Sequence, residues 1–109
     1  HERQKEIRNM RLYNCNADCT ANTLRSYNTY VFWVKGTRFF VLFLYPSVTS
    51  KSHIRKYVKW LKENSFDYTA KTVERMYRIG ISNKSTFVVY DSKNMEHSCL
   101  DELPDYLKR

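Results

Sequence analysis

The strongest constraint on the fold of this chain is a pair of apolar runs separated by a short segment that contains one of its two glycines. The runs are Tyr30–Val34 and Phe39–Tyr45, and both are rich in the aromatic and β-branched residues that favour strands. Lys35 and Gly36 stand between them, and glycine readily adopts the positive φ that a tight turn needs. The pattern predicts a β-hairpin whose two-residue loop is Lys35-Gly36.

That loop sets the expected register, with Trp33 opposite Arg38 and Phe32 opposite Phe39. Because side chains alternate between the two faces of a strand, each face of the hairpin receives its own apolar set. The first set is Tyr30, Phe32, Val34, Phe39, Val41 and Phe43. The second set is Tyr27, Val31, Trp33, Phe40, Leu42 and Leu44.

One layer of helices covers only one face of a sheet, so the second apolar face needs more of the same chain, a twin subunit or another partner. We expect a symmetric homodimer to satisfy this need slightly better than the short remaining segments, because a two-fold axis makes one patch self-complementary. In the expected register, Trp33 and Arg38 stack as a cation–π pair at the rim of that interface. The expected interface residues are Tyr27, Trp33, Arg38, Phe40 and Leu42.

An amphipathic helix is predicted after Pro46, which lacks the amide hydrogen that a strand requires. It spans roughly Ser50–Asn64, and its apolar residues recur at i, i+3, i+4 and i+7. The buried stripe is Ile54, Tyr57, Val58 and Leu61. The hydroxyls available to cap its N-terminus are those of Thr49, Ser50 and Ser52.

A second helix is predicted over about Thr69–Ile79, with Gly80 in the left-handed position that follows a helix. Its expected buried residues are Val73, Met76 and Tyr77. Three further elements complete the prediction: an edge strand in 10–15, a third strand at 86–90 and a short terminal helix over 100–107. The expected class is α+β, an antiparallel sheet of three to four strands with a central β-hairpin, two amphipathic helices and a short C-terminal helix.

The 109 residues are expected to form a single domain, 1–109. Hydrophobic residues make up 42% of the chain, which is too many for a disordered tail. Nineteen lysines and arginines against eleven acidic residues give a net charge of +8. Such a balance favours an anionic partner, of which nucleic acid, a membrane surface and an acidic protein are the main kinds.

The positive charge is concentrated in residues 49–78, where eight basic residues face three acidic ones, a net charge of +5. Helical spacing aligns several of them along one face, where they are able to follow a phosphate backbone. Trp60, Tyr57 and Tyr68 are close in sequence and are candidates for stacking on bases. The alternative is an ordinary solvated helix face. The candidate binding residues are Lys51, Arg55, Lys56, Lys59, Lys62, Lys71, Arg75 and Arg78.

Metal binding and catalysis have little support in the sequence. The possible soft ligands Cys15, Cys19, His97 and Cys99 lack the spacing of a common zinc site, so we expect free thiols and no metal or other cofactor. His53 and His97 have potential carboxylate partners in Asp18, Asp67 and Asp91, but no nucleophile motif fixes a reaction. We therefore expect a protein that is not an enzyme, with a small nuclease as the third hypothesis.

The segment 24–66 resembles a group of small proteins encoded by phages and mobile elements of Gram-positive bacteria. The matching residues are Ser26-Tyr27-Asn28-Thr29, Tyr45, Thr49, His53-Ile54 and Tyr57-Val58. The chain departs from the pattern at Pro46, at Ser50 where a second threonine is usual, and at Ser52 where arginine usually precedes the histidine. The resemblance implies origin more than activity, and it suggests a packed, hydrogen-bonded cluster of Tyr27, Thr29 and His53 between hairpin and helix.

Small phage proteins of this kind often bind a host or defence complex. The leading hypothesis is a non-enzymatic binding protein that engages nucleic acid or a nucleoprotein, including an anti-CRISPR-like inhibitor that occupies a nucleic-acid path. The alternative is a protein-only inhibitor or dimeric structural module that uses the apolar hairpin face. The charged first residues and the absence of an apolar run of about 20 residues give the expectation of a protein in the host cytoplasm, without a membrane partner.

Overall fold

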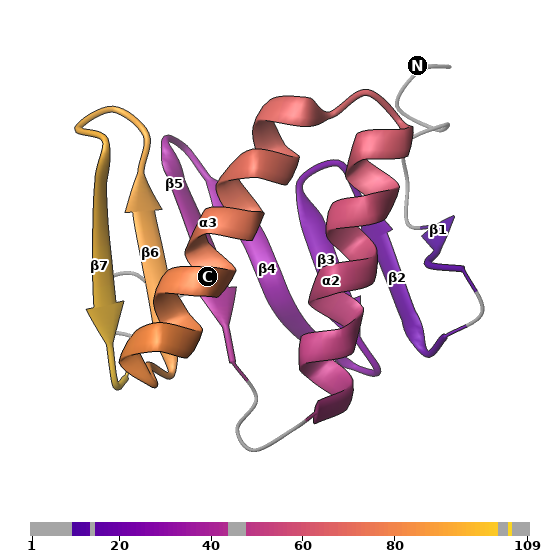
Figure 1. The fold of residues 1–109 in the computed structure, drawn as a ribbon, viewed down its shortest axis with the longest axis horizontal. Helices are drawn as coiled ribbons and strands as arrows, with labels where there is room; N and C mark the ends of the chain where they lie inside the picture. Colours follow the sequence, from indigo (N-terminus) through magenta and orange to yellow (C-terminus); the bar gives the residue numbers. More distant parts are fainter. Residues whose placement is uncertain (1–9, 14, 44–47, 103–104, 106–109) are drawn as a thin grey trace.

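The computed structural model describes residues 10–13, 15–43, 48–102 and 105. Within these residues the chain forms one antiparallel sheet and two helices (Figure 1). The strands are β1 (Met10–Arg11), β2 (Ala17–Thr20), β3 (Thr23–Ser26), β4 (Thr29–Lys35), β5 (Arg38–Leu42), β6 (Phe87–Asp91) and β7 (Glu96–Leu100). The helices are α2 (Val48–Glu63) and α3 (Asp67–Asn83).

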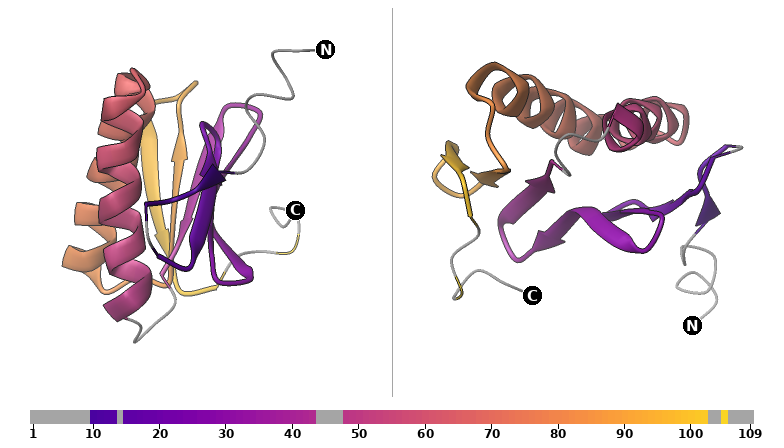
Figure 2. Two further views of the ribbon diagram at one scale, coloured as in Figure 1. Left: turned by 90° about the vertical axis from the view of Figure 1, so that its right-hand side faces the viewer. Right: turned by 90° about the horizontal axis from the view of Figure 1, so that it is seen from below.

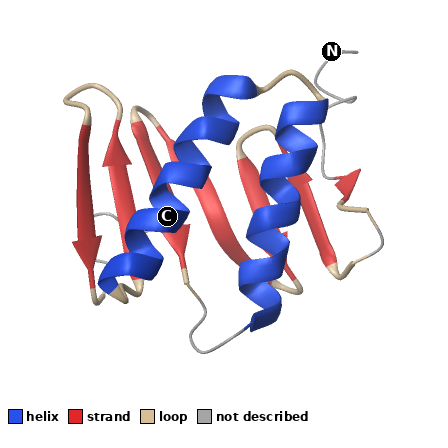
Figure 3. Ribbon diagram, viewed as in Figure 1, coloured by secondary structure: helices blue, strands red, loops and turns tan. Residues whose placement is uncertain are grey.

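The sheet follows the order of the chain, β1 to β7, and each strand pairs with the next in antiparallel orientation. The helices are inserted between β5 and β6, and both cover the same face of the sheet (Figures 2 and 3). The predicted α+β class with an antiparallel sheet and two amphipathic helices is confirmed. The prediction of three to four strands was too low, because the described residues contain seven.

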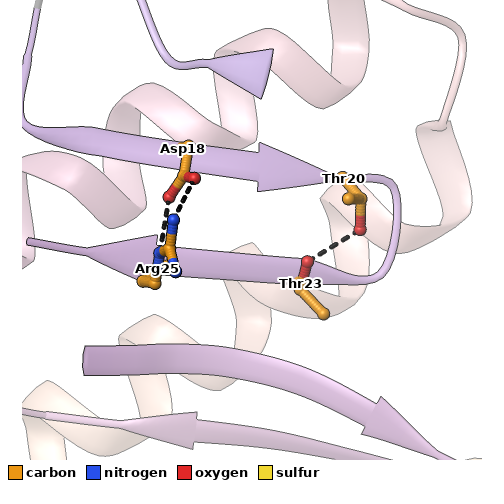
Figure 4. A network of polar contacts seen from close by, with 4 residues as sticks. All are labelled: Asp18, Thr20, Thr23 and Arg25. Atoms are coloured by element: carbon orange, nitrogen blue, oxygen red, sulfur yellow. Dashed lines mark hydrogen bonds and ion pairs between the residues drawn. The ribbon is translucent and has the colours of Figure 1, made fainter. Parts of the chain in front are cut away.

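The additional strands are short and polar on one face. In the β2–β3 hairpin, Asp18 lies opposite Arg25, and Thr20 lies opposite Thr23. Arg25 donates two hydrogen bonds to the Asp18 carboxylate, at 3.0 and 2.6 Å, and the two threonine hydroxyls are 2.7 Å apart (Figure 4). Such cross-strand pairs stabilise the hairpin. The strands were not predicted, because their alternation of apolar and polar residues is too short to be recognised in the sequence.

The predicted terminal helix is wrong at its beginning, because Leu100 is the last residue of β7. Residues 103–104 and 106–107 of that prediction lie outside the described residues. The edge strand expected in 10–15 is reduced to Met10–Arg11. The expected end of a strand at Pro46 also lies outside the described residues.

The β4–β5 hairpin forms, but its register differs from the prediction. Lys35 pairs with Arg38, and Trp33 pairs with Phe40, so the loop is Gly36-Thr37 rather than Lys35-Gly36. Gly36 has a φ of +63°. A glycine with positive φ at the first central position is typical of a type II′ turn, which explains why the loop begins at the glycine.

The two faces of the hairpin are largely those predicted, because the change of register moves no side chain to the opposite face. A β-bulge against β3 makes the exception: Leu24 pairs with Phe32 and Arg25 with Tyr30, which leaves Val31 as the additional residue. Val31 therefore joins the core under the helices, and Tyr30 joins the opposite face, the reverse of the prediction.

The main core lies between the sheet and the helices. The predicted stripe of α2 is buried there, as are Val73 and Met76 of α3.

Helix α2 begins at Val48, so Ser52 lies in its interior and is not a capping residue. Gly80 does not end α3, because the helix continues to Asn83 and Lys84 takes the left-handed position with a φ of 53°. Gly80 is instead a packing residue: a Cβ at this position would lie 2.1 Å from the Phe43 ring.

A second, smaller core lies on the face of the sheet opposite the helices. Trp33 stacks on Phe40 at a centroid distance of 5.1 Å, and Val89 of β6 is buried beside them. Phe40 is only 1% exposed within the single chain. The centre of this face is therefore buried within the single chain, as one of the alternatives required, and the expected homodimer stays a prediction.

Two of the predicted interface residues are not part of this second core. Tyr27 is 58% exposed in the turn between β3 and β4, and its ring lies 5.8 Å from that of His53, on the helix side. Arg38 lies opposite Lys35 and Asp91 and not opposite Trp33, because the loop is displaced by one residue. The expected cation–π pair of Trp33 and Arg38 therefore does not follow from the observed register.

Candidate functional site

The helices turn a strongly basic surface away from the sheet. Residues 48–83 contain eight basic and three acidic residues, a net charge of +5. Seven of the eight basic side chains are exposed, and Lys51 is half-buried. The basic surface consists of Lys51, Arg55, Lys56, Lys59 and Lys62 on α2 and Lys71, Arg75 and Arg78 on α3.

Local sequence explains this orientation. Arg55, Lys59 and Lys62 follow one another at i, i+4 and i+7, and Lys71, Arg75 and Arg78 repeat the same spacing on α3. Residues at these intervals share one face of a helix. The apolar stripes of both helices pack on the sheet, so the basic residues remain in water.

A groove of about 480 Å³ runs between α2 and α3 within the basic surface. Its apolar lining comes from Ile54 and Val58, which are buried, and from Tyr77, which is half-buried. Cations from both helices surround this lining, together with two carboxylates. The charged lining residues are Arg55, Lys59, Lys62, Glu63, Glu74 and Arg78. We call this feature the interhelical groove.

The carboxylates of the groove compensate only part of its positive charge. Lys62 Nζ lies 3.9 Å from Glu74 Oε1, a long ion pair that joins the two helices. Glu63 accepts a hydrogen bond from the Tyr13 hydroxyl. Burial and this hydrogen bond raise the pKa of Tyr13 to about 12, so Tyr13 remains a neutral donor. Lys59 Nζ lies 5.5 Å from the centre of the Tyr13 ring.

Five other cations of the basic surface are not neutralised by a carboxylate in the described residues. Within the described part of the chain, no ion pair involves Arg55, Lys56, Lys71, Arg75 or Arg78. Unpaired exposed cations create a positive field that attracts anions. Arg75 contributes to it beside β6 and β7, where its charge acts on Tyr90 and His97.

The structure brings together only some of the predicted binding residues. Arg55, Lys59, Lys62 and Arg78 line the interhelical groove. Lys51 lines a separate hollow beside Gly80 and Lys84. Lys56, Lys71 and Arg75 line neither hollow.

The sequence interpretation recognised Glu63 only as a balancing charge on the basic face, missed Glu74 as a member of the site and assigned Tyr77 to the core alone. Glu74, Tyr77 and Arg78 stand at i, i+3 and i+4. This spacing places them on one helix face and was the available signal that they act together.

The aromatic residues proposed for base stacking are placed differently from the prediction. Tyr57 is fully buried, and its hydroxyl donates to the Thr20 carbonyl at 2.8 Å. Trp60 is half-buried between the rings of Tyr57 and Phe66. Tyr68 is 61% exposed, but its ring makes a T-shaped contact with that of Phe39 and does not line the groove. Tyr77 is therefore the aromatic residue that the groove presents.

The four potential metal ligands lie in two separate places. Cys15 and Cys19 are on the β1–β2 side of the sheet, and His97 and Cys99 are on β7 at the opposite edge. The Cys15 thiol donates to the Leu12 carbonyl, and burial raises the pKa of Cys19 to about 12. Among the residues that the structure describes, no three His, Cys, Asp or Glu side chains are grouped to hold a metal ion.

His53 is a structural residue in the observed arrangement. It is 3% exposed, and its Nδ1 lies 2.7 Å from the hydroxyl of Ser26, which is also buried. The expected hydrogen-bonded cluster of Tyr27, Thr29 and His53 is not the observed one: His53 bonds Ser26, Thr29 is exposed, and the exposed Tyr27 contributes only a ring contact with His53. Burial and the nearby positive charge of Lys56 lower the pKa of His53, so the neutral ring is favoured.

Comparisons with known proteins do not extend these observations, because no family model, curated protein or solved structure matches the chain. Neither described helix is both long enough and apolar enough to span a membrane.

Proposed function

We propose that this protein binds nucleic acid, free or as part of a nucleoprotein, through the basic surface of α2 and α3. The observation that carries the proposal is the convergence of Arg55, Lys59, Lys62 and Arg78 from two helices on one groove. This arrangement supports binding, because several cations held on one rigid surface release counterions from a phosphate backbone together.

The dimensions of the surface support the same proposal. Lys51 and Lys62 are separated by roughly 16 Å along α2, at a rise of about 1.5 Å per residue. Cations distributed over this length are able to contact several successive phosphates. The resemblance to phage proteins makes a nucleoprotein of the host or of its defence system the natural target, and occupation of its nucleic-acid path the natural mode of inhibition.

The alternative of a protein-only module that uses the apolar hairpin face is less well supported. Trp33, Phe40 and Val89 form the centre of that face and are buried within the single chain. The apolar residues packed around this centre are themselves half-buried, so the face offers a partner less apolar area than the sequence pattern suggests. We therefore propose the helix surface as the binding surface.

The test is charge reversal with a matched control. Arg55→Glu, Lys59→Glu and Arg78→Glu in one variant should weaken binding of a mixed-sequence oligonucleotide by at least about 100-fold at low salt. The control carries Lys35→Glu, Arg38→Glu and Lys93→Glu, which make the same change of net charge at exposed turns on the sheet. The control should bind nearly as tightly as the unmodified chain.

Two measurements interpret the result. Circular dichroism should show that both variants are folded. The slope of log K against log salt should fall in magnitude by about 2 in the helix variant, because three phosphate contacts are lost. Equal binding by the two variants, or no binding of nucleic acid by the unmodified chain, would overturn the proposal.

A further inference from the structure

The interhelical groove contains features that phosphate binding alone does not require. Glu74 and Glu63 line the groove among the cations, and a carboxylate repels a phosphate. Ile54, Val58 and Tyr77 give the groove an apolar lining, whereas a phosphate prefers polar donors. A site built only for a sugar–phosphate backbone would carry neither feature.

The same features suit a nucleobase. Tyr77 provides an aromatic ring, and any of the bases is able to stack on such a ring, because every base has a π-face. A carboxylate accepts hydrogen bonds from the amino groups of bases, as aspartate and glutamate do with cytosine. The ion pair of Glu74 with Lys62 is long, at 3.9 Å, so the Glu74 carboxylate retains capacity to accept further hydrogen bonds.

The arrangement of charged and apolar residues also provides separate positions for the backbone and for a base of a bound nucleic acid. Arg55 and Lys59 are on α2, Arg78 is on α3, and the apolar residues lie between the helices. A backbone that follows the cations would direct a base into the groove between them. In a duplex the bases are paired and stacked inside, so none is available to enter such a groove.

We propose that the interhelical groove binds one unpaired base of a single-stranded nucleic acid, with the base packed against Tyr77 and its amino group bonded to Glu74. This inference rests on the proposed function and specifies its ligand. Bases with an amino group, such as cytosine, are preferred over thymine, which has none. Single strands are preferred over the duplex of the same sequence.

The test uses two 12-nucleotide DNA strands that differ at one central position, cytosine or thymine in an otherwise all-thymine sequence. The unmodified protein should bind the cytosine strand about fivefold to tenfold more tightly. It should bind the single strand more tightly than a duplex of the same length at equal salt. Fluorescence anisotropy with labelled strands measures both ratios.

Variants of the groove assign the effect to its residues. Glu74→Gln should reduce the preference for cytosine, because the amide accepts from cytosine more weakly than a carboxylate and can also donate to thymine. It should increase overall affinity, because one negative charge is removed. Glu96→Gln is the matched control, since it removes an exposed carboxylate on β7 and should keep the preference. Tyr77→Leu should weaken single-strand binding about tenfold, while Tyr77→Phe, which keeps the ring, should not.

The outcomes separate this inference from the proposed function. If the duplex binds as tightly as the single strand and the cytosine preference is absent, the base-binding groove is wrong. Charge reversal at Arg55, Lys59 and Arg78 would still test the basic surface in that case. If the unmodified chain binds neither strand nor duplex, both proposals are wrong.

Discussion

At the scale of single residues, histidines and glycines carry the most testable consequences of the structure. His53 of α2 is held against the end of β3 and the β3–β4 turn, where it contacts the Ser26 hydroxyl and the ring of Tyr27. His97 lies on β7 with its ring 4.4 Å from that of Tyr90, and burial followed by the positive charge of Arg75 lowers its pKa. Both rings are therefore favoured in the neutral form when the chain is folded.

This state of the histidines predicts a loss of stability in mild acid. An unfolded histidine takes up a proton near pH 6.5, while the folded pKa values of His53 and His97 are lower. The unfolded chain thus binds more protons as the pH falls below about 6.5, and the free energy of unfolding decreases in that range. The stabilising contribution is complete above the unfolded pKa.

Urea unfolding at several pH values between 7.5 and 5 measures this effect. His53→Gln keeps a side chain able to hydrogen-bond Ser26 but does not titrate, so its stability should vary less with pH than that of the unmodified chain. A variant with the same pH dependence as the unmodified chain would show that His53 is not responsible.

A second prediction at this scale concerns Gly80. Replacing a glycine inside a helix with alanine usually stabilises by about 1 kcal/mol. At Gly80 we expect a net destabilisation of about 1–3 kcal/mol instead, because the new Cβ would lie 2.1 Å from the buried Phe43 ring. Chemical denaturation measures the sign.

A double variant identifies the cause. Gly80→Ala combined with Phe43→Leu should be less destabilised than the sum of the two single variants, because the smaller side chain removes the steric conflict. Strict additivity would mean that Phe43 is not what excludes a side chain at position 80.

At the scale of elements, α2 and α3 act as one unit that presents the candidate site. Their apolar stripes fix them to the sheet, and their antiparallel packing forms the interhelical groove. The amphipathic pattern allowed both helices and the outward direction of their cations to be predicted. The groove was not predictable, because it depends on which flanks of the two helices face each other.

The strands of the sheet likewise divide into those that the sequence predicted and those that it did not. The apolar pattern was sufficient to predict the β4–β5 hairpin and strand β6. It was not sufficient for the β2–β3 hairpin, whose strands alternate buried and half-buried residues over only four positions, or for β7, in which no residue is fully buried. Those strands are specified by pairing with neighbours, and pairing is a tertiary property.

At the scale of the whole molecule, the second core predicts the result of a polar substitution on the face opposite the helices. Phe40→Asp places a carboxylate where the side chain is 1% exposed, among Trp33 and Val89. We expect a loss of several kcal/mol, sufficient to unfold or precipitate the chain.

The competing expectation is that Phe40→Asp only dissociates a dimer. Sedimentation and circular dichroism distinguish the two cases. A folded, soluble monomer produced by Phe40→Asp from a dimeric parent would contradict the interpretation of this face as an intramolecular core.

The sequence by itself determined the α+β class, the central hairpin, both amphipathic helices and the positions of the eight cations. These depend on local periodicity, turn chemistry and charge, which neighbouring residues carry. Only the tertiary structure decided the extent of the sheet, the bulge that places Val31 in the main core, the role of Gly80 and the meeting of Arg55 with Glu74, Tyr77 and Arg78 around one groove. These depend on contacts between segments distant in sequence, and periodicity carries no information about which faces meet.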